Sequence, residues 1–286
     1  MNLGTFVCTS LAMMSCLVAS AAQLHRQTEA LAHDRVLVKI FLQTPRVSLH
    51  EPVLVTLQIR NNGQSPAEVD LGRDRKENFL VAITLPTGEK IQPPQLRRSG
   101  FTRIGEVEVG VGDEYSQSIV LNEWYDFRDT GLYEIEVKLA KPAMVNGEVA
   151  GGERSLHQQL EIEPRNPQRL TMTCKDLVAG IEGSTSYESM VVDAVALSYV
   201  NDPVAVPYLQ EILGANELVE PIAIQGLERI ATPEAVRVLS LALEITQGNV
   251  SVLARSALLR MEAETSDPKV KQEIQHIFKD TPNPKS

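Results

Sequence analysis

Residues 195–241 read VALSYVNDPVAVPYLQEILGANELVEPIAIQGLERIATPEAVRVLSL and repeat one pattern with a fixed period. Five positions return thirty residues later: Leu197 as Leu227, Val200 as Ile230, Pro203 as Pro233, Ala205 as Ala235 and Leu209 as Leu239. A weaker third copy with a four-residue insertion follows, in Ala257, Leu258, Met261, Pro268, Val270 and Ile274. Apolar residues at helical spacing in such a period predict stacked helix pairs rather than a closed catalytic domain.

Helices are expected over residues 168–280, after the two prolines of Glu163–Pro167 end the last strand. The first helix is expected at Thr173–Ile181. Asp202-Pro203 and Thr232-Pro233 each place a capping side chain before a helix-opening proline. With these starts and the paired Ala-Leu positions, the segment resembles HEAT repeats. The resemblance implies a short α-solenoid.

The first half alternates apolar and polar residues with a period of two, which predicts about seven or eight short strands over residues 34–163. Asp129-Thr130-Gly131-Leu132-Tyr133 resembles a tyrosine corner, in which a tyrosine bonds back to the loop before its strand. The expected fold is an immunoglobulin-like antiparallel β-sandwich followed by the HEAT-like solenoid, a multidomain β plus α protein. Trp124 is expected in the sandwich core, with an exposed binding patch as the alternative.

Residues 35–139 are also similar to bacterial β-sandwiches of the proteinase-inhibitor and cell-adhesion kinds. Asn61-Asn62-Gly63 after the second strand and the late Gly-x-Tyr strand carry this resemblance. The resemblance implies a β-sandwich fold. An alternative function is that of a proteinase inhibitor acting through a sandwich loop such as Gln92–Gly105, which is long and carries two prolines and two adjacent arginines.

The two ends of the chain are expected to lie outside these domains. Residues 1–22 are apolar and uncharged, and Ala19 and Ala21 suit an A-x-A cleavage site, so they predict a signal peptide. The protein is therefore expected to be exported, to the periplasm or the extracellular space. An uncleaved signal or a lipid on Cys16 is the alternative and the one expected link to a membrane. The polar, proline-rich residues 281–286 are expected to be disordered.

Composition and cysteine usage exclude several classes of protein. The net charge of −10 argues against a nucleic-acid binder, because phosphate recognition needs a basic face. Cys8 and Cys16 leave with the signal, so the mature chain has only Cys174 and no disulfide. We expect Cys174 to be a half-buried apolar residue near a helix start, with a reactive thiol as the alternative.

Motifs that carry chemistry are absent from the sequence. The five histidines are scattered and form no H-E-x-x-H pair, and there is no nucleophile elbow, phosphate loop or CxxC. A cation loop is the weaker interpretation of one charged stretch, which alternates with basic residues: Asp70, Asp74, Glu77 and Asn78. No catalytic residue, cofactor or metal site is therefore predicted, and the protein is expected not to be an enzyme.

One charge pattern in the helical half points to a partner. Nine acids and no Lys or Arg lie between Asp176 and Glu228. This interval is either a solvated face or an acidic stripe for a basic partner. The partner-binding residues predicted are Glu182, Asp193, Glu211 and Glu220.

The leading hypothesis is thus an exported, non-enzymatic protein-protein interaction module that uses its helical surface. The proteinase inhibitor is the second hypothesis. An enzyme whose site assembles across both domains is the third.

Overall fold

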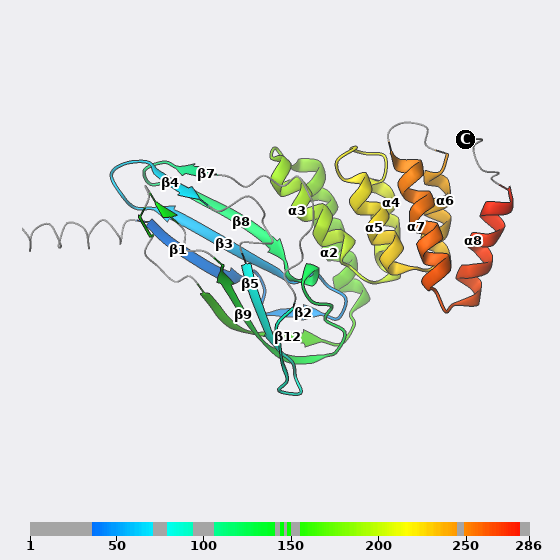
Figure 1. The fold of residues 1–286 in the computed structure, drawn as a ribbon, viewed down its shortest axis with the longest axis horizontal. Helices are drawn as coiled ribbons and strands as arrows, with labels where there is room; N and C mark the ends of the chain where they lie inside the picture. The colour runs from blue at the N-terminus through cyan, green and yellow to red at the C-terminus, as the bar shows by residue number, and fades with distance from the viewer. Residues whose placement is uncertain are drawn as a thin grey trace, which may run out of the picture.

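The computed structural model describes residues 36–70, 79–93, 106–140, 144–145, 148–149, 155–244 and 249–280. Within these residues, β-sheets form the N-terminal half and seven helices form the C-terminal half (Figure 1). The predicted signal segment 1–22, the tail 281–286 and most of the two predicted loops (71–78 and 94–105) lie outside the described residues. The mixed β plus α class is confirmed.

Two sheets contain the longer strands of the β half. A three-stranded sheet has the order β1 (Val36–Leu42), β3 (Leu54–Asn61), β8 (Glu114–Val120). A five-stranded sheet has the order β2 (Arg46–Ser48), β12 (Ser155–Glu163), β9 (Gly131–Leu139), β5 (Phe79–Thr84), β6 (Lys90–Ile91). Neighbouring strands are antiparallel except for β2, which pairs parallel with β12.

A third sheet is made of short strands, in the order β11 (Glu148–Val149), β10 (Met144–Val145), β4 (Ala67–Asp70), β7 (Glu106–Val109). The Asn-Gly turn after β3 leads into this sheet, because β3 pairs with β1 and β8 and not with β4. Asn61, the last residue of β3, stabilises the turn by which the chain passes from one sheet to the other. Its buried side-chain amide donates to the carbonyl oxygens of Ser65 and Val109, each at 2.9 Å, and accepts from the Gly63 N–H.

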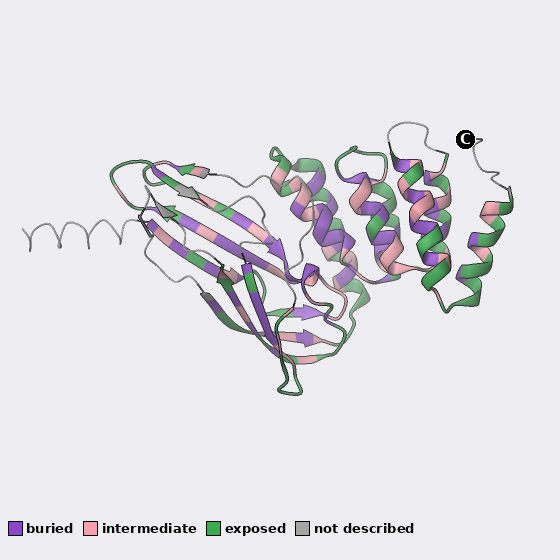
Figure 2. Cartoon of the chain, in the orientation of Figure 1, coloured by how far each residue is buried: buried purple, intermediate pink, exposed green. Residues whose placement is uncertain are grey.

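The core of the β half is one cluster with side chains from all three sheets. The period of two is visible in β1, where alternate residues are buried, and in the buried inner faces of Figure 2. Trp124 is 7% exposed and lies in this cluster, which confirms its predicted place in the core. The hydrogen bond of the predicted tyrosine corner is also present, since the Tyr133 hydroxyl donates to the Asp129 carbonyl at 2.8 Å.

The seven helices follow β12 with short connections. They are α2 (Pro167–Gly183), α3 (Tyr187–Ser198), α4 (Val206–Ile212, after a 3-10 turn at Pro203–Ala205), α5 (Glu220–Ile230), α6 (Pro233–Ala242), α7 (Val250–Glu264) and α8 (Pro268–Asp280). The predicted start of the first helix at Thr173 was wrong. The helix begins at Pro167, because proline suits the first helical position and the Asn166 side chain caps the Arg169 N–H at 3.1 Å.

The helices lie in two layers. α3, α5 and α7 contact one another in turn, and α2, α4, α6 and α8 do the same. Leu197, Leu227 and Leu258 on α3, α5 and α7 are all fully buried, so the predicted repeat register of these leucines is confirmed. A small residue is favoured before Leu227, because a Cβ on Gly226 would lie 3.0 Å from the backbone Cα of Ser198 and 2.9 Å from the Leu209 side chain.

The predicted caps before the prolines are also present. The Asp202 carboxylate accepts from the Val204 N–H at 3.0 Å, and the Thr232 hydroxyl accepts from the Ala235 N–H at 3.3 Å. These bonds satisfy N–H groups that a helix start leaves without an intrahelical partner. The two caps precede α4 and α6, so the repeated capping residue and proline set where each of these helices starts.

The β half and the helices share buried contacts. Val120 of β8 is fully buried within the helical core, and Leu54 of β3 packs against it. The Glu51 carboxylate accepts from Arg169 Nε and from the Thr173 hydroxyl, each at 2.8 Å. Cys174 beside them is fully buried rather than half-buried, and burial raises its thiol pKa to about 12, so it stays protonated.

Candidate functional site

The ends of the helices form two edges of the helical half. Successive helices run in opposite directions, so the C-terminal ends of α2, α4 and α6 meet the N-terminal ends of α3, α5 and α7 along one edge. This is the upper edge in Figure 1. The connections from α3 to α4, from α5 to α6 and from α7 to α8 lie along the opposite, lower edge.

Glutamates collect at the upper edge. We call the following five residues the acidic edge: Glu182 at the end of α2, Glu188 at the start of α3, Glu211 at the end of α4, Glu217 in the connection after it, and Glu220 at the start of α5. The chain has no Lys or Arg between residues 176 and 228, so α3, α4 and the connections beside them supply no opposite charge. Within the described residues, no ion pair engages any of the five.

Two of these glutamates stand where a helix disfavours negative charge. Glu182 and Glu211 are exposed and lie in the last turns of α2 and α4, which hold no basic residue. The partial negative charge of a helix C-terminus repels a carboxylate by a few tenths of a kcal/mol to about 1 kcal/mol. These two glutamates therefore lower the stability of the helical half slightly, and positive charge placed beside them would remove the repulsion.

The structure does not bring all four predicted residues together on a surface. Glu182 and Glu211 are exposed at the acidic edge. Glu220 belongs to the same edge by position, but it is only 9% exposed and is one of the buried residues of α5. The expectation that it faces solvent was wrong.

Asp193 does not lie at the acidic edge. It lies within α3 against Gly180 of α2, where a Cβ on the glycine would be 2.4 Å from Asp193 Oδ2. Burial raises the pKa of this carboxyl above its usual value. Asp193 is therefore a packing residue between two helices, and sequence spacing alone could not separate it from the exposed acids.

Glu188 and Glu217 belong to the edge although they were not among the predicted residues. Glu188 accepts a hydrogen bond from the Tyr115 hydroxyl at 3.3 Å, which ties the start of α3 to β8. Burial and the Glu188 charge both raise the pKa of Tyr115, so it remains a neutral donor. Sequence reasoning could have identified both glutamates from their positions beside helix ends. Successive helices run in opposite directions, so every second connection between helices lies at the same edge.

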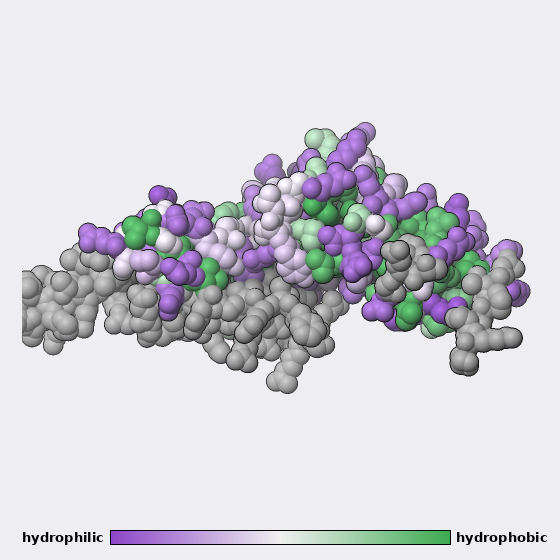
Figure 3. Space-filling model, turned by 90° about the horizontal axis from the view of Figure 1, so that it is seen from above, coloured by the Kyte–Doolittle hydropathy of each residue, from purple (hydrophilic) through white to green (hydrophobic). Residues whose placement is uncertain are grey.

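Exposed apolar side chains lie at the same edge. Tyr187 at the start of α3 is 53% exposed, and Leu218 in the connection before α5 is 50% exposed. Leu241, in the last turn of α6, is 56% exposed. Figure 3, seen from above, shows apolar surface bordered by hydrophilic side chains over the helical half. Apolar centres with polar rims are typical of protein-protein interfaces.

Two acids of the interval lie at the lower edge, and each forms an ion pair with an arginine. Arg165 forms a bidentate ion pair with Asp202, in which Arg165 Nε donates to Oδ2 and Arg165 Nη2 donates to Oδ1 at 2.9 Å. Arg260 forms a bidentate ion pair with Glu228 in the same way. Arg229 lies over the Tyr199 ring, 3.9 Å from the ring centre. Of the nine acids in the interval, the two at the lower edge are thus paired with arginines, whereas no Lys or Arg among the described residues forms an ion pair with the glutamates of the acidic edge.

Comparisons with known proteins do not place the chain in a family. No family matches the sequence, and no curated protein matches it. Among solved structures, it is similar to a CARDB domain from Pyrococcus furiosus, at 11% identity and a TM-score of 0.24, over 45% of this chain and 87% of that one. It is also similar to the sporulation control protein Spo0M of Bacillus subtilis, at 12% identity and a TM-score of 0.25, over 51% and 55%.

A third similar structure is an alkylpurine DNA glycosylase of Pseudomonas fluorescens, at 15% identity and a TM-score of 0.22, over 46% of this chain and 32% of that one. The chain covers less than two thirds of the glycosylase and of Spo0M. TM-scores this low carry no argument about fold or activity, so the function has to be argued from the surfaces of the chain.

In the part of the chain that is described, no three His, Cys, Asp or Glu side chains form a group suited to a metal ion. Among the same residues, no helix has the length and hydropathy needed to cross a bilayer. The predicted inhibitory loop is described only at Gln92 and Pro93.

Proposed function

We propose that the protein is an exported, non-enzymatic interaction module that binds a basic protein partner at its acidic edge. The observation that carries the proposal is the contrast between the two helix edges. Asp202 and Glu228 at the lower edge are paired with arginines of the chain. Within the described residues, Glu182, Glu211 and Glu217 have no ion pair, and exposed Tyr187 and Leu218 lie at the same edge as these glutamates.

The proposal includes an immunoglobulin-like sandwich for the β half. The strand order β1-β3-β8 in one sheet and β2-β12-β9-β5 in the other supports it, as does the single cluster of buried side chains that the sheets share. The Tyr133 bond at the start of β9 supports it further, because a tyrosine corner occupies this place in such folds.

A short HEAT-like solenoid for the helices is supported by their two layers and by the buried Leu197, Leu227 and Leu258, one on each of three successive helices of one layer. In a solenoid each repeat contacts only its neighbours, so the helix ends form long edges that are free to bind a partner. A row of side chains along such an edge suits an extended or helical segment of another protein.

Export rests on the sequence of residues 1–22, and it has its own test. The mature protein recovered from the producing cell should begin near Gln23, which N-terminal sequencing would establish. A chain that retains Met1 and stays in the cytoplasm would contradict export and would leave the binding proposal standing.

Capture from an envelope fraction tests the binding proposal. Three immobilised proteins should be compared: the native chain, Glu182→Lys with Glu211→Lys, and the control Glu234→Lys with Glu264→Lys. The two variants change net charge equally, and the control residues are exposed at the lower edge. The proposal expects a basic protein that the native chain and the control retain and the upper-edge variant loses. The same proteins retained by all three would contradict it.

A further inference from the structure

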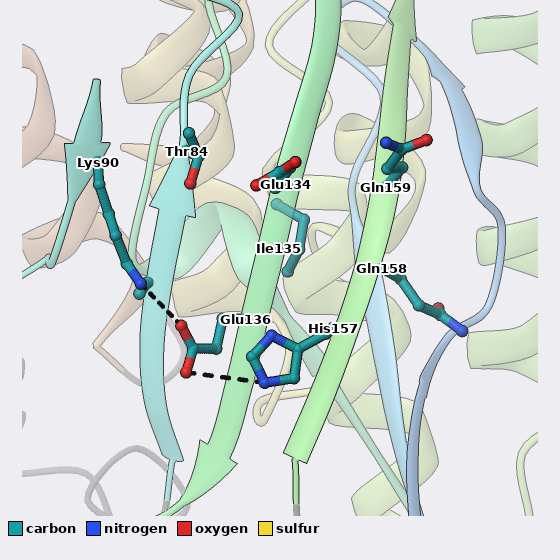
Figure 4. Close-up of a pocket in the computed structure, with 9 residues that line it drawn as sticks. Thr84, Lys90, Glu134, Ile135, Glu136, His157, Gln158 and Gln159 are labelled. Carbon is teal, nitrogen blue, oxygen red and sulfur yellow. Dashed lines mark hydrogen bonds and ion pairs between the residues drawn. The ribbon is translucent and has the colours of Figure 1, made fainter. Parts of the chain in front are cut away.

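A groove crosses the outer face of the five-stranded sheet, away from the acidic edge. It consists of two hollows of about 360 and about 460 Å³, which share Ala82, Lys90 and Glu136. The first hollow extends across β9 to β12, as Figure 4 shows, and the second extends toward Pro93 and Trp124. Hollows of this size suit a small organic ligand.

One carboxylate at the centre of the groove holds two lysines. Glu136 Oε2 is 2.9 Å from Lys90 Nζ, and Glu136 Oε1 lies 3.8 Å from His157 Nε2 (Figure 4). Glu136 Oε1 also pairs with Lys138 Nζ. The two lysine hydrogen bonds hold the pKa of Glu136 at about 2, so it stays ionised. Each carboxylate oxygen of Glu136 therefore holds one lysine, and the carboxylate positions the two ammonium groups.

The lysines keep hydrogen-bonding capacity for a ligand. An ammonium group has three N–H donors, and one from each lysine is used on Glu136. Lys90 and Lys138 are 54% and 50% exposed, so the remaining donors can be reached from solvent. In the second hollow these two lysines face one carboxylate, Glu136, whereas the first hollow also contains Glu134. An anionic group is therefore favoured in the second hollow.

An apolar wall adjoins the two lysines. Leu80 is 44% exposed and pairs across the strands with Lys138, and Pro93 lines the same hollow. Trp124 also borders this hollow, although its side chain belongs to the buried core. A ligand that only carried charge would leave this wall in water, and a purely apolar ligand would cover the ammonium donors without accepting from them. The chemistry fits a molecule with both parts.

We propose that the second hollow binds an organic carboxylate with an apolar body, whose carboxylate accepts from Lys138 and Lys90 and whose body lies on Leu80 and Pro93. The terminal carboxylate of a peptide that ends in an apolar residue and a free aliphatic acid share this chemistry. The proposal is independent of the acidic edge, because the two sites use different halves of the chain.

Fluorescence can test the site directly. Trp124 is the single tryptophan of the chain and lines the hollow, so its emission reports on this place. Octanoate should change the emission saturably, whereas octylammonium, with the same apolar body, should not. A peptide that ends in leucine should compete with octanoate if it binds there, and its amidated form should not.

Lys138→Gln should weaken octanoate binding about tenfold, because a charge-assisted hydrogen bond is lost. The matched control is Lys39→Gln, on the exposed side of β1 in the other sheet, which should leave binding unchanged. Leu80→Asn should also weaken octanoate binding and leaves both lysines in place. Circular dichroism should show that each variant is folded. Equal binding of octylammonium, or native affinity in both the Lys138 and Leu80 variants, would overturn the proposal.

Discussion

Glu182 and Glu211 occupy equivalent places, the exposed last turns of α2 and α4, at the same edge of the helical half although α3 separates them in the chain. Neither has an ion-pair partner among the described residues. Each stands against the negative end of its own helix, which costs stability. A partner that brings positive charge to both would bind two repeats at once.

The repeat register predicts a large effect of one leucine. Leu227→Ala should reduce the free energy of unfolding by about 2–5 kcal/mol, because a fully buried leucine leaves a cavity between α3, α5 and α7. Urea denaturation measures the loss. Leu259→Ala removes the same atoms from a residue that is 50% exposed and should change stability by less than about 0.5 kcal/mol. Similar losses for both variants would show that the register is wrong.

Asp193 should make the protein less stable as pH rises. Burial raises its folded-state pKa above the usual 3.8, so the folded state binds the proton more tightly than the unfolded state does. Stability is then lost as pH rises from 3.8 through the raised value. Asp193→Asn should raise the melting temperature at pH 7 and have a smaller effect near pH 4. The exposed Asp176→Asn is the control, and an equal shift from it would refute the assignment.

The tyrosine corner should contribute a measurable hydrogen bond. Tyr133→Phe removes the bond to the Asp129 carbonyl and keeps the buried ring, so unfolding should become easier by about 0.5–1.5 kcal/mol. Tyr125→Phe changes the same group on a partly exposed ring nearby and should have a smaller effect. Thermal unfolding of both variants compares them. An unchanged free energy of unfolding in Tyr133→Phe would mean that the hydrogen bond does not stabilise the fold.

The junction between the halves predicts opposite effects of one substitution. Residues 34–165 should fold alone as β protein, but this fragment exposes Val120, which the helices bury completely in the whole chain. Val120→Thr should therefore make the fragment more soluble and destabilise the whole chain by about 1–3 kcal/mol. Circular dichroism and solubility of the four proteins test this. A fragment without β signal would argue against a separable β half.

The sequence predicted features that depend on local spacing. The buried leucines of the repeat, the caps at Asp202 and Thr232 and the Tyr133 bond all follow from residues close together in the chain. The burial of Glu220 and the packing of Asp193 on Gly180 depend on how helices meet, which spacing does not specify. The groove around Glu136 was not predicted because it needs the register of β5 and β6 against β9 and β12, which are distant from them in the sequence.

The association rate of the basic partner retained in the capture experiment tests the central claim most directly. It should be measured for the native chain, the Glu182→Lys/Glu211→Lys variant and the Glu234→Lys/Glu264→Lys control, at several salt concentrations. The account predicts that the rate falls with salt and is at least about tenfold lower for the upper-edge variant, because long-range attraction steers the encounter. The dissociation rate should change less. An association rate that does not depend on salt concentration, or that falls as much in the lower-edge control as in the upper-edge variant, would contradict binding at the acidic edge.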